Sequence, residues 1–485
     1  MKTLDLIIPT LNLTVRGNSQ IEVLGITADS RTVREGTLFA AIKGTQVDGH
    51  DHIESAIQSG ATAILHEYSL ESYHPGVCYL QAQDVPETLG QLLYEFNDRC
   101  LDDLIVVGTT GTNGKTTVST LLFDLFTQLG YKCGLISTVT VQIAGETRIS
   151  THTTPDAVAL HALFKDMLEA GCTHVFMEVS SHAIHQKRIA GVPFYGAIFT
   201  NITHDHLDYH VTFDEYIKAK KMFFDGLRDT AFSLTNKDDR NGLVMLQNTR
   251  ATRYTYGLNG TADFNAKIWE CDFSGMHLRL FDKDIWSPLI GRFNAYNMMA
   301  VYAAATLITE GNEEIEVAMS ALKRVSGRFE TMAGPGNRTV IIDYAHTPDA
   351  LENVIATIQE IQKNASQLIC VVGCGGNRDA EKRPKMGRIA SQKSQRCIFT
   401  SDNPRNEDPN TIISEMMLGV ATIDSRKVLK ITDRAEAIKT AIALSYPGDV
   451  ILIAGKGHET YQETNGLRIE FDDRIWAQNA LNDIS

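Results

Sequence analysis

Residues 108–117, GTTGTNGKTT, have the residue types and the spacing of a phosphate-binding loop. They follow an apolar, strand-like run and precede a long segment with helical periodicity, which is the context that such a loop requires. Gly111 and Gly114 let backbone N–H groups converge on phosphate oxygens, and the following helix adds its positive end. Lys115 then reaches the terminal phosphates, and the hydroxyl of Thr116 suits Mg²⁺. The loop predicts nucleotide binding but leaves the reaction open.

A GTPase-type switch is one alternative for a protein with such a loop. Residues 236–239, NKDD, fit the N-K-x-D pattern that recognises guanine. A switch also needs a D-x-x-G motif after a strand between the loop and this pattern, and the sequence has none there. The corresponding strand-like run, HVFMEVSSH, carries Glu178 as its acid. Because a short NKDD turn arises easily by chance, the sequence favours an ATP-using enzyme over a switch.

A second polar cluster, FTNITHDHLDYH at 199–210, contains residue types that bind metals. The candidates are His204, Asp205, His206, Asp208 and His210. Spacing of two residues in a loop does not force these side chains onto one site, so a polar loop in which one histidine matters is the alternative. Lys220 follows in a segment with helical periodicity, and composition alone predicts a surface lysine there.

A third candidate, TSDNPRNEDP at 400–409, begins at the end of an apolar, strand-like run. Pro404 lacks an N–H group and fixes φ, so the chain must turn here. The turn carries Asp402 and Arg405, and ligands of open parallel sheets lie beyond the carboxyl ends of the strands. The sequence therefore leaves two interpretations, a plain turn and a binding loop for a charged ligand.

The elements around these motifs alternate between short apolar strands and amphipathic helices. This rhythm predicts an α/β protein with mostly parallel sheets. The chain has 485 residues, which is too many for one hydrophobic core. We expect boundaries near residues 100 and 332, which give units at 1–100, 101–332 and 333–485. The central unit is expected to be a P-loop parallel-sheet ATPase domain, and the C-terminal unit a Rossmann-like domain.

Composition narrows the function classes. Lysine plus arginine (45) minus aspartate plus glutamate (59) gives a net charge of −14, which argues against a general nucleic-acid partner. The 8 cysteines contain no C-x-x-C pair, so free thiols are expected. No apolar run approaches the ~18–20 residues of a membrane span, and the start lacks a signal-peptide pattern. We therefore expect a cytoplasmic protein without membrane insertion.

The motifs together carry a resemblance to a known family. In order along the chain they are GTTGTNGKTT, EVSSHA, TNITHDHLDYH, YIKAKKMFF, GRFNAYN, SGRFET, DYAHTPDAL, GCGGNRD, SDNPR and AGKGHE. In this order they resemble the Mur ligases over nearly the whole chain. The related folylpolyglutamate synthetases share the ATP core. They are not expected to carry the opening ADSRTVREGTLFAAIKG, which looks like a uridine-nucleotide-binding domain.

The resemblance implies three domains, one for the UDP end of a substrate, one for ATP and one for an amino acid. It implies ATP contacts from Gly111, Thr112, Asn113, Gly114, Lys115, Thr116, Thr117, Asn297, Asp343 and His346. It implies contacts to the UDP-substrate from Ser30, Thr153, Thr154, Ser180, Gln186 and Arg188. It also implies Mg²⁺ ligands at Thr116, Glu178, His206 and Lys220, with this lysine carbamylated by CO₂.

The implied reaction is ATP-dependent amide formation in the synthesis of a peptidoglycan precursor. A carboxylate of UDP-N-acetylmuramoyl-L-alanyl-D-glutamate would become an acyl phosphate, which the amine of a third amino acid attacks. ATP is a co-substrate and Mg²⁺ the cofactor. The catalytic residues implied are Lys115, Glu178, His206 and Lys220.

Within the family, the D-N-P-R motif matches the form that selects meso-diaminopimelate. This amino acid has one carboxylate more than lysine, and an arginine fork binds a carboxylate with two hydrogen bonds. The lysine-adding form, which lacks that arginine, is the alternative. The residues expected to bind diaminopimelate are Arg378, Asp402, Asn403, Pro404, Arg405, Gly455 and Glu459.

Overall fold

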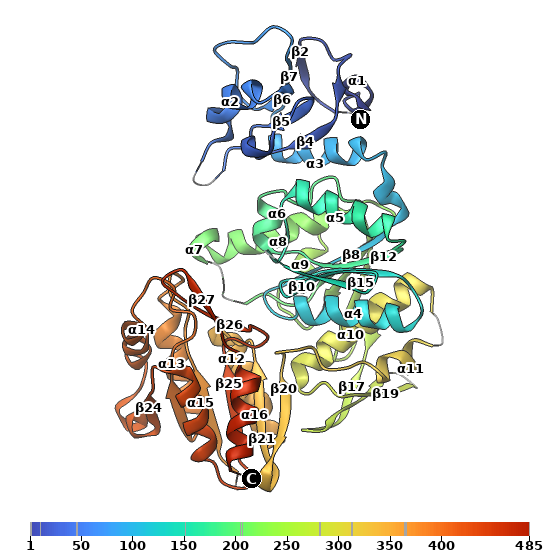
Figure 1. The fold of residues 1–485 in the computed structure, drawn as a ribbon. Coiled ribbons are helices and arrows are strands. Elements are labelled where there is room, and N and C mark those ends of the chain that lie inside the picture. Colours follow the sequence, from blue (N-terminus) through green and yellow to red (C-terminus); the bar gives the residue numbers. More distant parts are fainter. Residues whose placement is uncertain are drawn as a thin grey trace.

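The computed structural model shows three α/β units that follow one another along the chain (Figure 1). It describes residues 2–9, 11–44, 47–150, 152–203, 205, 207–280, 283–311, 314–362 and 366–484, with only the backbone at 149, 207 and 208. His206 lies outside these residues.

The N-terminal unit is built on a five-stranded sheet with the order β2-β7-β6-β5-β4. Its strands are β2 (Thr14–Arg16), β4 (Gly25–Thr27), β5 (Thr37–Ala40), β6 (Ala61–His66) and β7 (Cys78–Gln81). All neighbours are parallel except β2 and β7. The other elements are β1 (Lys2–Thr3), β3 (Glu22–Val23), α1 (Leu4–Ile7), α2 (Ile53–Gln58) and α3 (Val85–Phe96).

Helix α3 joins the N-terminal unit to the central one (Figure 1). The side chain of Asp84 caps its first turn by accepting from the backbone N–H of Glu87. Val85, Leu89 and neighbouring apolar residues of the helix are buried in the core of the N-terminal unit. Gly90 lies against the central unit, where a Cβ would come within 2.3 Å of the carbonyl oxygen of Ala190. The two backbones can meet this closely only because the residue is glycine.

The central unit contains a nine-stranded sheet with the order β11-β10-β9-β12-β8-β13-β14-β15-β16. Its strands are β8 (Ile105–Thr110), β9 (Cys133–Ile136), β10 (Thr140–Ile143), β11 (Glu146–Ile149), β12 (His174–Glu178), β13 (Gly196–Phe199), β14 (Phe232–Asn236), β15 (Thr252–Gly257) and β16 (Phe264–Asn265). From β9 to β16 the neighbours are parallel. The carboxyl ends of β8, β12 and β13 therefore meet at one edge, where a ligand is expected.

The helices of the central unit are α4 (Lys115–Gln128), α5 (Ala157–Glu169), α6 (Ser181–His185), α7 (Leu207–His210), α8 (Phe213–Asp225), α9 (Gly242–Met245), α10 (Arg292–Thr309) and α11 (Ile315–Ser320). A smaller antiparallel sheet extends from this unit. It consists of β17 (Lys267–Asp272), β18 (Gly275–Leu280) and β19 (Lys283–Ser287).

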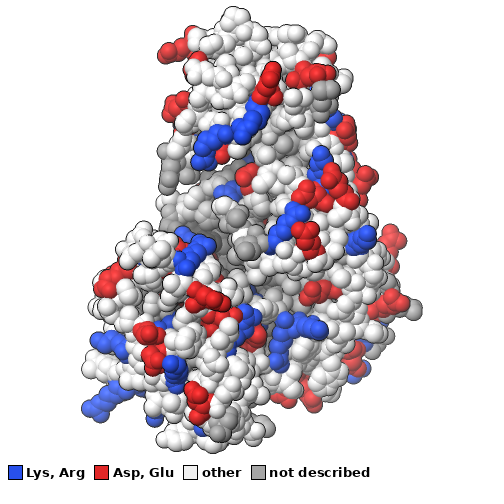
Figure 2. All heavy atoms as spheres, viewed as in Figure 1, with Lys and Arg blue, Asp and Glu red and all other residues white. Residues whose placement is uncertain are grey.

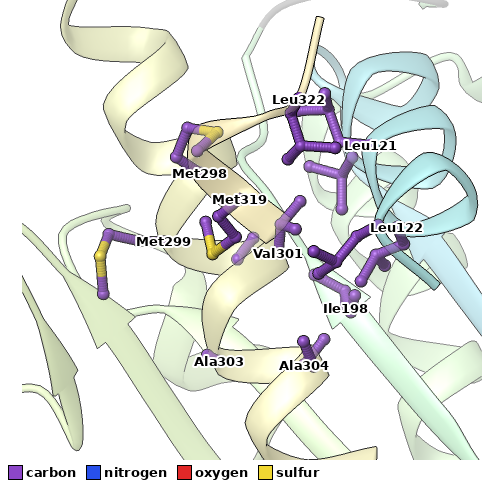
Figure 3. Close-up of a cluster of buried hydrophobic side chains, with 14 of the residues drawn as sticks. Leu121, Leu122, Ile198, Met298, Met299, Val301, Ala303, Ala304, Met319 and Leu322 are labelled. Atoms are coloured by element: carbon purple, nitrogen blue, oxygen red, sulfur yellow. The ribbon is translucent and has the colours of Figure 1, made fainter. Parts of the chain in front are cut away.

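Helices α4 and α10 form the core that holds the phosphate-binding loop in place. Their apolar side chains interlock beside the sheet (Figure 3). Leu121 and Leu122 of α4 lie near Val301 of α10 and Ile198 of β13. Burying one such side chain stabilises the fold by about 1.5–3 kcal/mol. Small residues such as Ala304 leave room for this close packing.

The C-terminal unit has a six-stranded sheet with the order β20-β21-β25-β22-β23-β24. Its strands are β20 (Glu330–Gly334), β21 (Arg338–Asp343), β22 (Leu368–Val372), β23 (Arg396–Phe399), β24 (Val428–Lys430) and β25 (Val450–Ala454). The other elements are α12 (Pro348–Ile361), α13 (Lys382–Lys393), α14 (Pro409–Met417), α15 (Arg434–Ala443), α16 (Asp473–Asp483) and a hairpin of β26 (Tyr461–Thr464) and β27 (Leu467–Glu470). β22 and β25 are entirely buried, which explains their continuous apolar sequences.

The architecture confirms the predicted α/β class with largely parallel sheets. The boundary expected near residue 332 falls within β20, the first strand of the C-terminal sheet. All 8 cysteines are free thiols. In the part of the chain that the structure describes, no helix has the length and apolar character needed to span a bilayer. Basic and acidic side chains are intermixed on the face shown in Figure 2.

Candidate active site

The phosphate-binding loop connects β8 to α4 and is fixed by its neighbours. The backbone N–H of Asn113 donates to the side-chain oxygen of Asn201 at 2.9 Å, and the hydroxyl of Thr200 donates to the carbonyl of Asn113 at 2.6 Å. Gly114 has a φ of +90°, and a Cβ there would lie 2.6 Å from the side-chain oxygen of Asn297. The predicted nucleotide residues Asn113, Gly114 and Asn297 therefore meet at the start of α4.

Lys115 folds back over this loop. Its Nζ donates to the carbonyl oxygens of Gly111 and Thr112, each at 2.9 Å. Burial lowers the pKa of Lys115, although the nearby carboxylates of Glu178 and Asp205 oppose this shift. The ammonium thus lies beside the backbone that is expected to hold phosphate oxygens. Thr116 and Thr117 follow in the buried first turn of α4.

Glu178 ends β12 directly beside α4 and is almost fully buried. Its carboxylate accepts from the hydroxyl of Thr116 at 2.9 Å and from the backbone N–H and hydroxyl of Thr138 at 2.7 and 3.1 Å. A hydroxyl and a carboxylate are hard oxygen ligands of the kind that Mg²⁺ prefers. The oxygen atoms of Thr116 and Glu178 therefore fit the predicted Mg²⁺. No cluster of three or more His, Cys, Asp or Glu side chains suited to a metal occurs among the described residues.

Lys220 is not the surface residue that composition predicts. It is 1% exposed and its Nζ donates to the carbonyl oxygen of Gly111 at 2.9 Å. The same nitrogen lies 4.6 Å from the centre of the Tyr216 ring. Lys220 shares the buried face of α8 with Tyr216, Phe223 and Phe224, because residues three and four apart lie on one side of a helix. Burial and the positive charge of Lys115 hold its pKa well below the ordinary value.

Of the predicted metal-binding cluster, His204, His206 and the side chain of Asp208 lie outside the described residues. His210 shares a hydrogen bond of 3.0 Å with the hydroxyl of Ser181 and packs against the ring of Tyr216.

The NKDD segment has a local structural role. Asp238 accepts from the backbone N–H of Leu258 at 2.7 Å, and Asp239 from that of Ile202 at 3.0 Å. These contacts explain NKDD as a structural turn.

The residues predicted to bind the UDP-substrate form a network beside Glu178, with one exception. The hydroxyl of Thr154 donates to the carbonyl of Glu178 at 2.8 Å and accepts from the backbone N–H of Ser180 at 3.1 Å. Arg188 donates to the carbonyl of Thr154 at 3.0 Å and to the side-chain oxygen of Gln186 at 2.9 Å. The hydroxyls of Thr138 and Thr153 are 3.1 Å apart. Ser30 belongs to the N-terminal unit, in a 3₁₀ turn that spans Ser30–Thr32.

Arg328 is a functional candidate that sequence reasoning did not assign. It lies between α11 and β20, and its guanidinium donates to the hydroxyl of Thr116 at 3.1 Å. The guanidinium carbon also lies 4.5 Å from the centre of the Tyr344 ring. This places a second cation beside the phosphate-binding loop. The SGRFET motif, which contains Arg328, was the sequence feature that could have indicated this residue. The role of Arg328, however, depends on a contact between residues 212 positions apart.

The C-terminal unit also reaches the loop through α12. The side chains of Asn113 and Thr203 both donate to Asp349, each at 3.1 Å. Asp343 ends β21 and accepts from the backbone N–H of Phe329 at 2.6 Å. Burial raises the pKa of Asp343 to about 6, although Arg328 opposes the shift. His346 follows on the same loop, with its ring 4.6 Å from that of Tyr344.

The predicted amino-acid residues gather at the carboxyl edge of the C-terminal sheet. Arg405 adopts a φ of +52° and donates from its guanidinium to the carbonyl of Gly376 at 2.8 Å. The side-chain amide of Asn403 donates to Glu459 at 2.8 Å. Gly455, at the end of β25, has a φ of +115°, and a Cβ there would lie 2.5 Å from the carboxylate of Asp402. Arg378 lies exposed on the neighbouring glycine-rich loop, and Pro404 is buried in the turn.

Charges of both signs face each other at this edge. Burial would raise the pKa of the Asp402 carboxyl, but buried Lys456 and Arg434 outweigh it and hold the pKa below its usual range. Asp402 is therefore an anion that suits an ammonium, while Arg405 suits a carboxylate. A turn that binds no ligand would need neither the buried anion of Asp402 nor the guanidinium of Arg405.

Three family descriptions together match most of the chain. The "Mur ligase family, catalytic domain" covers residues 22–96, the "Mur ligase middle domain" residues 109–305, and the "Mur ligase, glutamate ligase domain" residues 327–457. The chain belongs to the Mur ligase family. The GTPase-type alternative is therefore wrong.

Individual Mur ligases resemble the chain over its full length. The UDP-N-acetylmuramoyl-L-alanyl-D-glutamate--2,6-diaminopimelate ligase of Cytophaga hutchinsonii is 51% identical over 483 residues, which are 99% of each chain. A solved structure of a ligase with the same name is 32% identical, with a TM-score of 0.69 over 95% of each chain. The MurF ligase of Thermotoga maritima in complex with ADP shares the fold, with a TM-score of 0.61, 18% identity and coverage of 95% and 98%.

Proposed function

We propose that this Mur ligase joins meso-2,6-diaminopimelate to UDP-N-acetylmuramoyl-L-alanyl-D-glutamate, with cleavage of ATP to ADP and phosphate, in the synthesis of a peptidoglycan precursor. The observation that carries the proposal is that Arg405 lies at the same sheet edge as the acidic side chains of Asp402 and Glu459. Diaminopimelate ends in both a carboxylate and an ammonium, and this edge offers a partner for each. Relatives at about 50% identity carry the corresponding name.

The ATP chemistry follows from what amide formation needs. A carboxylate is a poor electrophile, so its oxygen first attacks the γ-phosphorus of ATP, ADP leaves, and an acyl phosphate forms. The uncharged amine then attacks the acyl carbon, phosphate leaves with the electron pair of the broken C–O bond, and the nitrogen loses a proton to solvent. Lys115 and Arg328 are two cations beside the phosphate-binding loop that offset charge on the transferred group.

The proposed Mg²⁺ would be held by Thr116 and Glu178, together with His206 and the carbamylated side chain of Lys220. When bound, the ion offsets the negative charge of the phosphates. Carbamylation requires an uncharged amine, because its lone pair forms the new N–C bond to CO₂ and a proton is then lost. The lowered pKa of Lys220 favours that uncharged form. The product is an anion, which explains why a lysine would serve as a metal ligand.

The remaining assignments concern the other substrate contacts. Thr153, Thr154, Ser180, Gln186 and Arg188 would bind the peptide side of the UDP-substrate, since they form one network beside Glu178. Ser30 would bind its UDP end, and residues 1–100 would form the domain for that end. Residues 101–332 and 333–485 would bind ATP and the amino acid. Because ATP and UDP-linked precursors are cytoplasmic metabolites, we place the reaction in the cytoplasm.

The test is product formation from the UDP-linked substrate and ATP with meso-diaminopimelate and L-lysine in parallel. We expect ADP, phosphate and the diaminopimelate product, with a much lower kcat/KM for lysine. A preference for lysine would instead identify the lysine-adding form of the ligase. Absence of ligation with either amino acid would contradict the proposed function.

A further inference from the structure

A buried lysine that the reaction as described does not use lies directly behind the amino-acid site. Lys456 follows β25 and is 0% exposed. Its Nζ donates to the side-chain oxygen of Asn403 at 3.0 Å and to Oε2 of Glu459 at 2.9 Å. The nitrogen also lies 5.5 Å from the centre of the Tyr461 ring. Complete burial of an ammonium is costly unless it is paired. A lysine at this position therefore needs a reason other than filling space.

The contacts of Lys456 fix the orientation of the Asn403 amide. The ammonium only donates, and so does the backbone N–H of Glu463, which reaches the same oxygen of Asn403 at 2.9 Å. The opposite end of the amide faces Oε2 of Glu459, which only accepts. The oxygen of Asn403 must therefore point to Lys456 and its nitrogen to Glu459. One oxygen of Glu459 is thereby occupied by two donors within the protein.

The same network reaches Arg405 through the hairpin. Glu463, whose N–H binds Asn403, accepts at its carbonyl oxygen from the backbone N–H of Arg405 at 3.0 Å. The carbonyl of Arg405 in turn accepts from the backbone N–H of Asn465 at 2.6 Å. These bonds hold Arg405 in its left-handed backbone conformation, which is unfavourable for a residue with a side chain. Lys456 is thus linked to the residues proposed for both charged groups at the distal end of the amino acid.

Counting charges gives Lys456 a second role. Arg405 is set against the distal carboxylate of the substrate; of the remaining groups, Asp402 and Glu459 supply two negative charges and Lys456 one positive charge, so 1 − 2 leaves −1. Arg434 adds no net charge because it is paired with Asp473 in a fully buried ion pair at 2.7 Å. One negative charge remains for one ammonium of a substrate.

We propose that Lys456 is a positioning and specificity-determining residue for the side-chain end of the amino-acid substrate. It orients Asn403 and Glu459 and leaves one negative charge for the distal ammonium. This inference rests on the proposed function, because it concerns the diaminopimelate site of the same reaction.

The test is Lys456→Met, which keeps the unbranched chain apart from its last atom and removes its charge. Losing hydrogen bonds from a charged donor should raise the KM for meso-diaminopimelate about ten- to a hundredfold. The KM values for ATP and the UDP-linked substrate should stay unchanged. The loss in kcat/KM should be smaller for 2-aminopimelate, which keeps both carboxylates but has no distal ammonium. Lys456→Arg keeps the charge and should recover part of the loss for meso-diaminopimelate.

Lys439→Met is the matched control. Lys439 also pairs with a glutamate three residues away, Glu436 at 2.8 Å, and lies 5.1 Å from the ring centre of Trp476, but it is on the surface. This variant should behave like the wild type. An unchanged KM for meso-diaminopimelate in Lys456→Met, or equal losses for the two amino acids, would overturn the inference. If Lys456→Met does not fold, the result for Lys456→Arg decides. Wild-type kinetics of Lys456→Arg with both amino acids would show that the position of the lysine ammonium is unimportant, and this would overturn the positioning role. A wild type without ligase activity contradicts the proposed function instead.

Discussion

Lys218 and Lys220 show how one residue type takes two roles on one helix. Lys218 is 67% exposed at its side chain and pairs with Glu215 on the surface of α8. Lys220 lies on the opposite, buried face and donates to the phosphate-binding loop. The chemistry of the second lysine therefore comes from its surroundings. Burial and the charge of Lys115 disfavour its ammonium form, which is the condition that the proposed reaction with CO₂ requires.

Lys220→Ala should lower the ligation rate by about 10- to 100-fold or more, because it removes the side chain proposed as a carbamylated metal ligand. Lys218→Ala should be active, since an exposed ion pair contributes only about 0–1 kcal/mol. The measurement is the steady-state rate at saturating substrates, with mass spectrometry of the native protein to detect the added CO₂. Full activity of Lys220→Ala would show that the residue only fills the core.

Arg405 is the residue on which the choice of amino acid depends in our proposal. Arg405→Ala should reduce kcat/KM for meso-diaminopimelate by roughly thirty- to a thousandfold, because a charge-assisted, bidentate contact is worth on the order of 2–4 kcal/mol. Arg405→Lys should recover only part of this, since a point charge does not reproduce the fork. The kcat/KM for lysine as the substrate should fall less, because lysine has no distal carboxylate for Arg405 to bind. Arg426→Ala, at an exposed position of the same unit, is the control. An unchanged ratio of the two specificity constants would assign the choice to other residues.

At the scale of elements, α3 is the joint between two units. It belongs to the core of the N-terminal unit, yet its Gly90 touches the backbone of the central unit at Ala190 and Gly191. Lys187 of the central unit adds ion pairs with Asp84 and Glu87 at the start of the helix. Lys187 lies between Gln186 and Arg188, so this joint supports the side chains proposed to bind the UDP-substrate.

Gly90→Ala tests this joint. Alanine normally stabilises a helix by about 0.5–1 kcal/mol relative to glycine. Here its Cβ would meet the carbonyl oxygen of Ala190, so the variant should instead be destabilised by about 1–3 kcal/mol, and the KM for the UDP-linked substrate should rise. Gly25→Ala, with open space around its Cβ, should change the stability by less than about 0.5 kcal/mol. Denaturant unfolding and initial rates measure both effects. A Gly90→Ala protein more stable than the wild type would exclude a close joint.

At the scale of the whole molecule, the catalytic parts come from units that are far apart in the sequence. The phosphate-binding loop belongs to the central unit, while Asp349 and the residues proposed to bind diaminopimelate belong to the C-terminal unit. Arg328 lies where these two units meet and contacts Thr116. Positioning substrates from separate domains is an effective route to catalysis when little covalent help from the protein is needed. The contacts at Arg328 and Asp349 thus help to fix the position of one unit relative to the other.

Asp349→Ala should loosen this arrangement, because it removes a carboxylate that accepts from both Asn113 and Thr203. Hydrogen bonds to charged groups contribute about 1.5–3 kcal/mol each, so kcat/KM for ATP should fall at least about tenfold. Glu352→Ala on the same helix removes only a surface pair with Lys393 and is the control. Small-angle scattering and initial rates provide the measurements. If both variants match the wild type, this contact has no role in holding the units together.

The sequence determined the parts that depend on neighbours along the chain. The phosphate-binding loop was predictable because its glycines, lysine and threonine act within ten residues of backbone between a strand and a helix. The D-N-P-R turn was predictable for the same reason, since it follows the buried strand β23. The family resemblance then supplied the substrates, and the comparisons confirmed the predicted fold class and family.

Tertiary structure decided the parts that depend on contacts between distant residues. Lys220 is buried only because α8 packs against a loop 109 residues away, and Arg328 meets Thr116 only because two units touch. Lys456 acquires its partner Asn403 across 53 residues, through the parallel order of β23, β22 and β25. Local patterns indicate which face of a helix is apolar, but they do not specify what covers it. The charge state and role of a buried lysine are set by those partners, because desolvation and nearby charges determine its pKa.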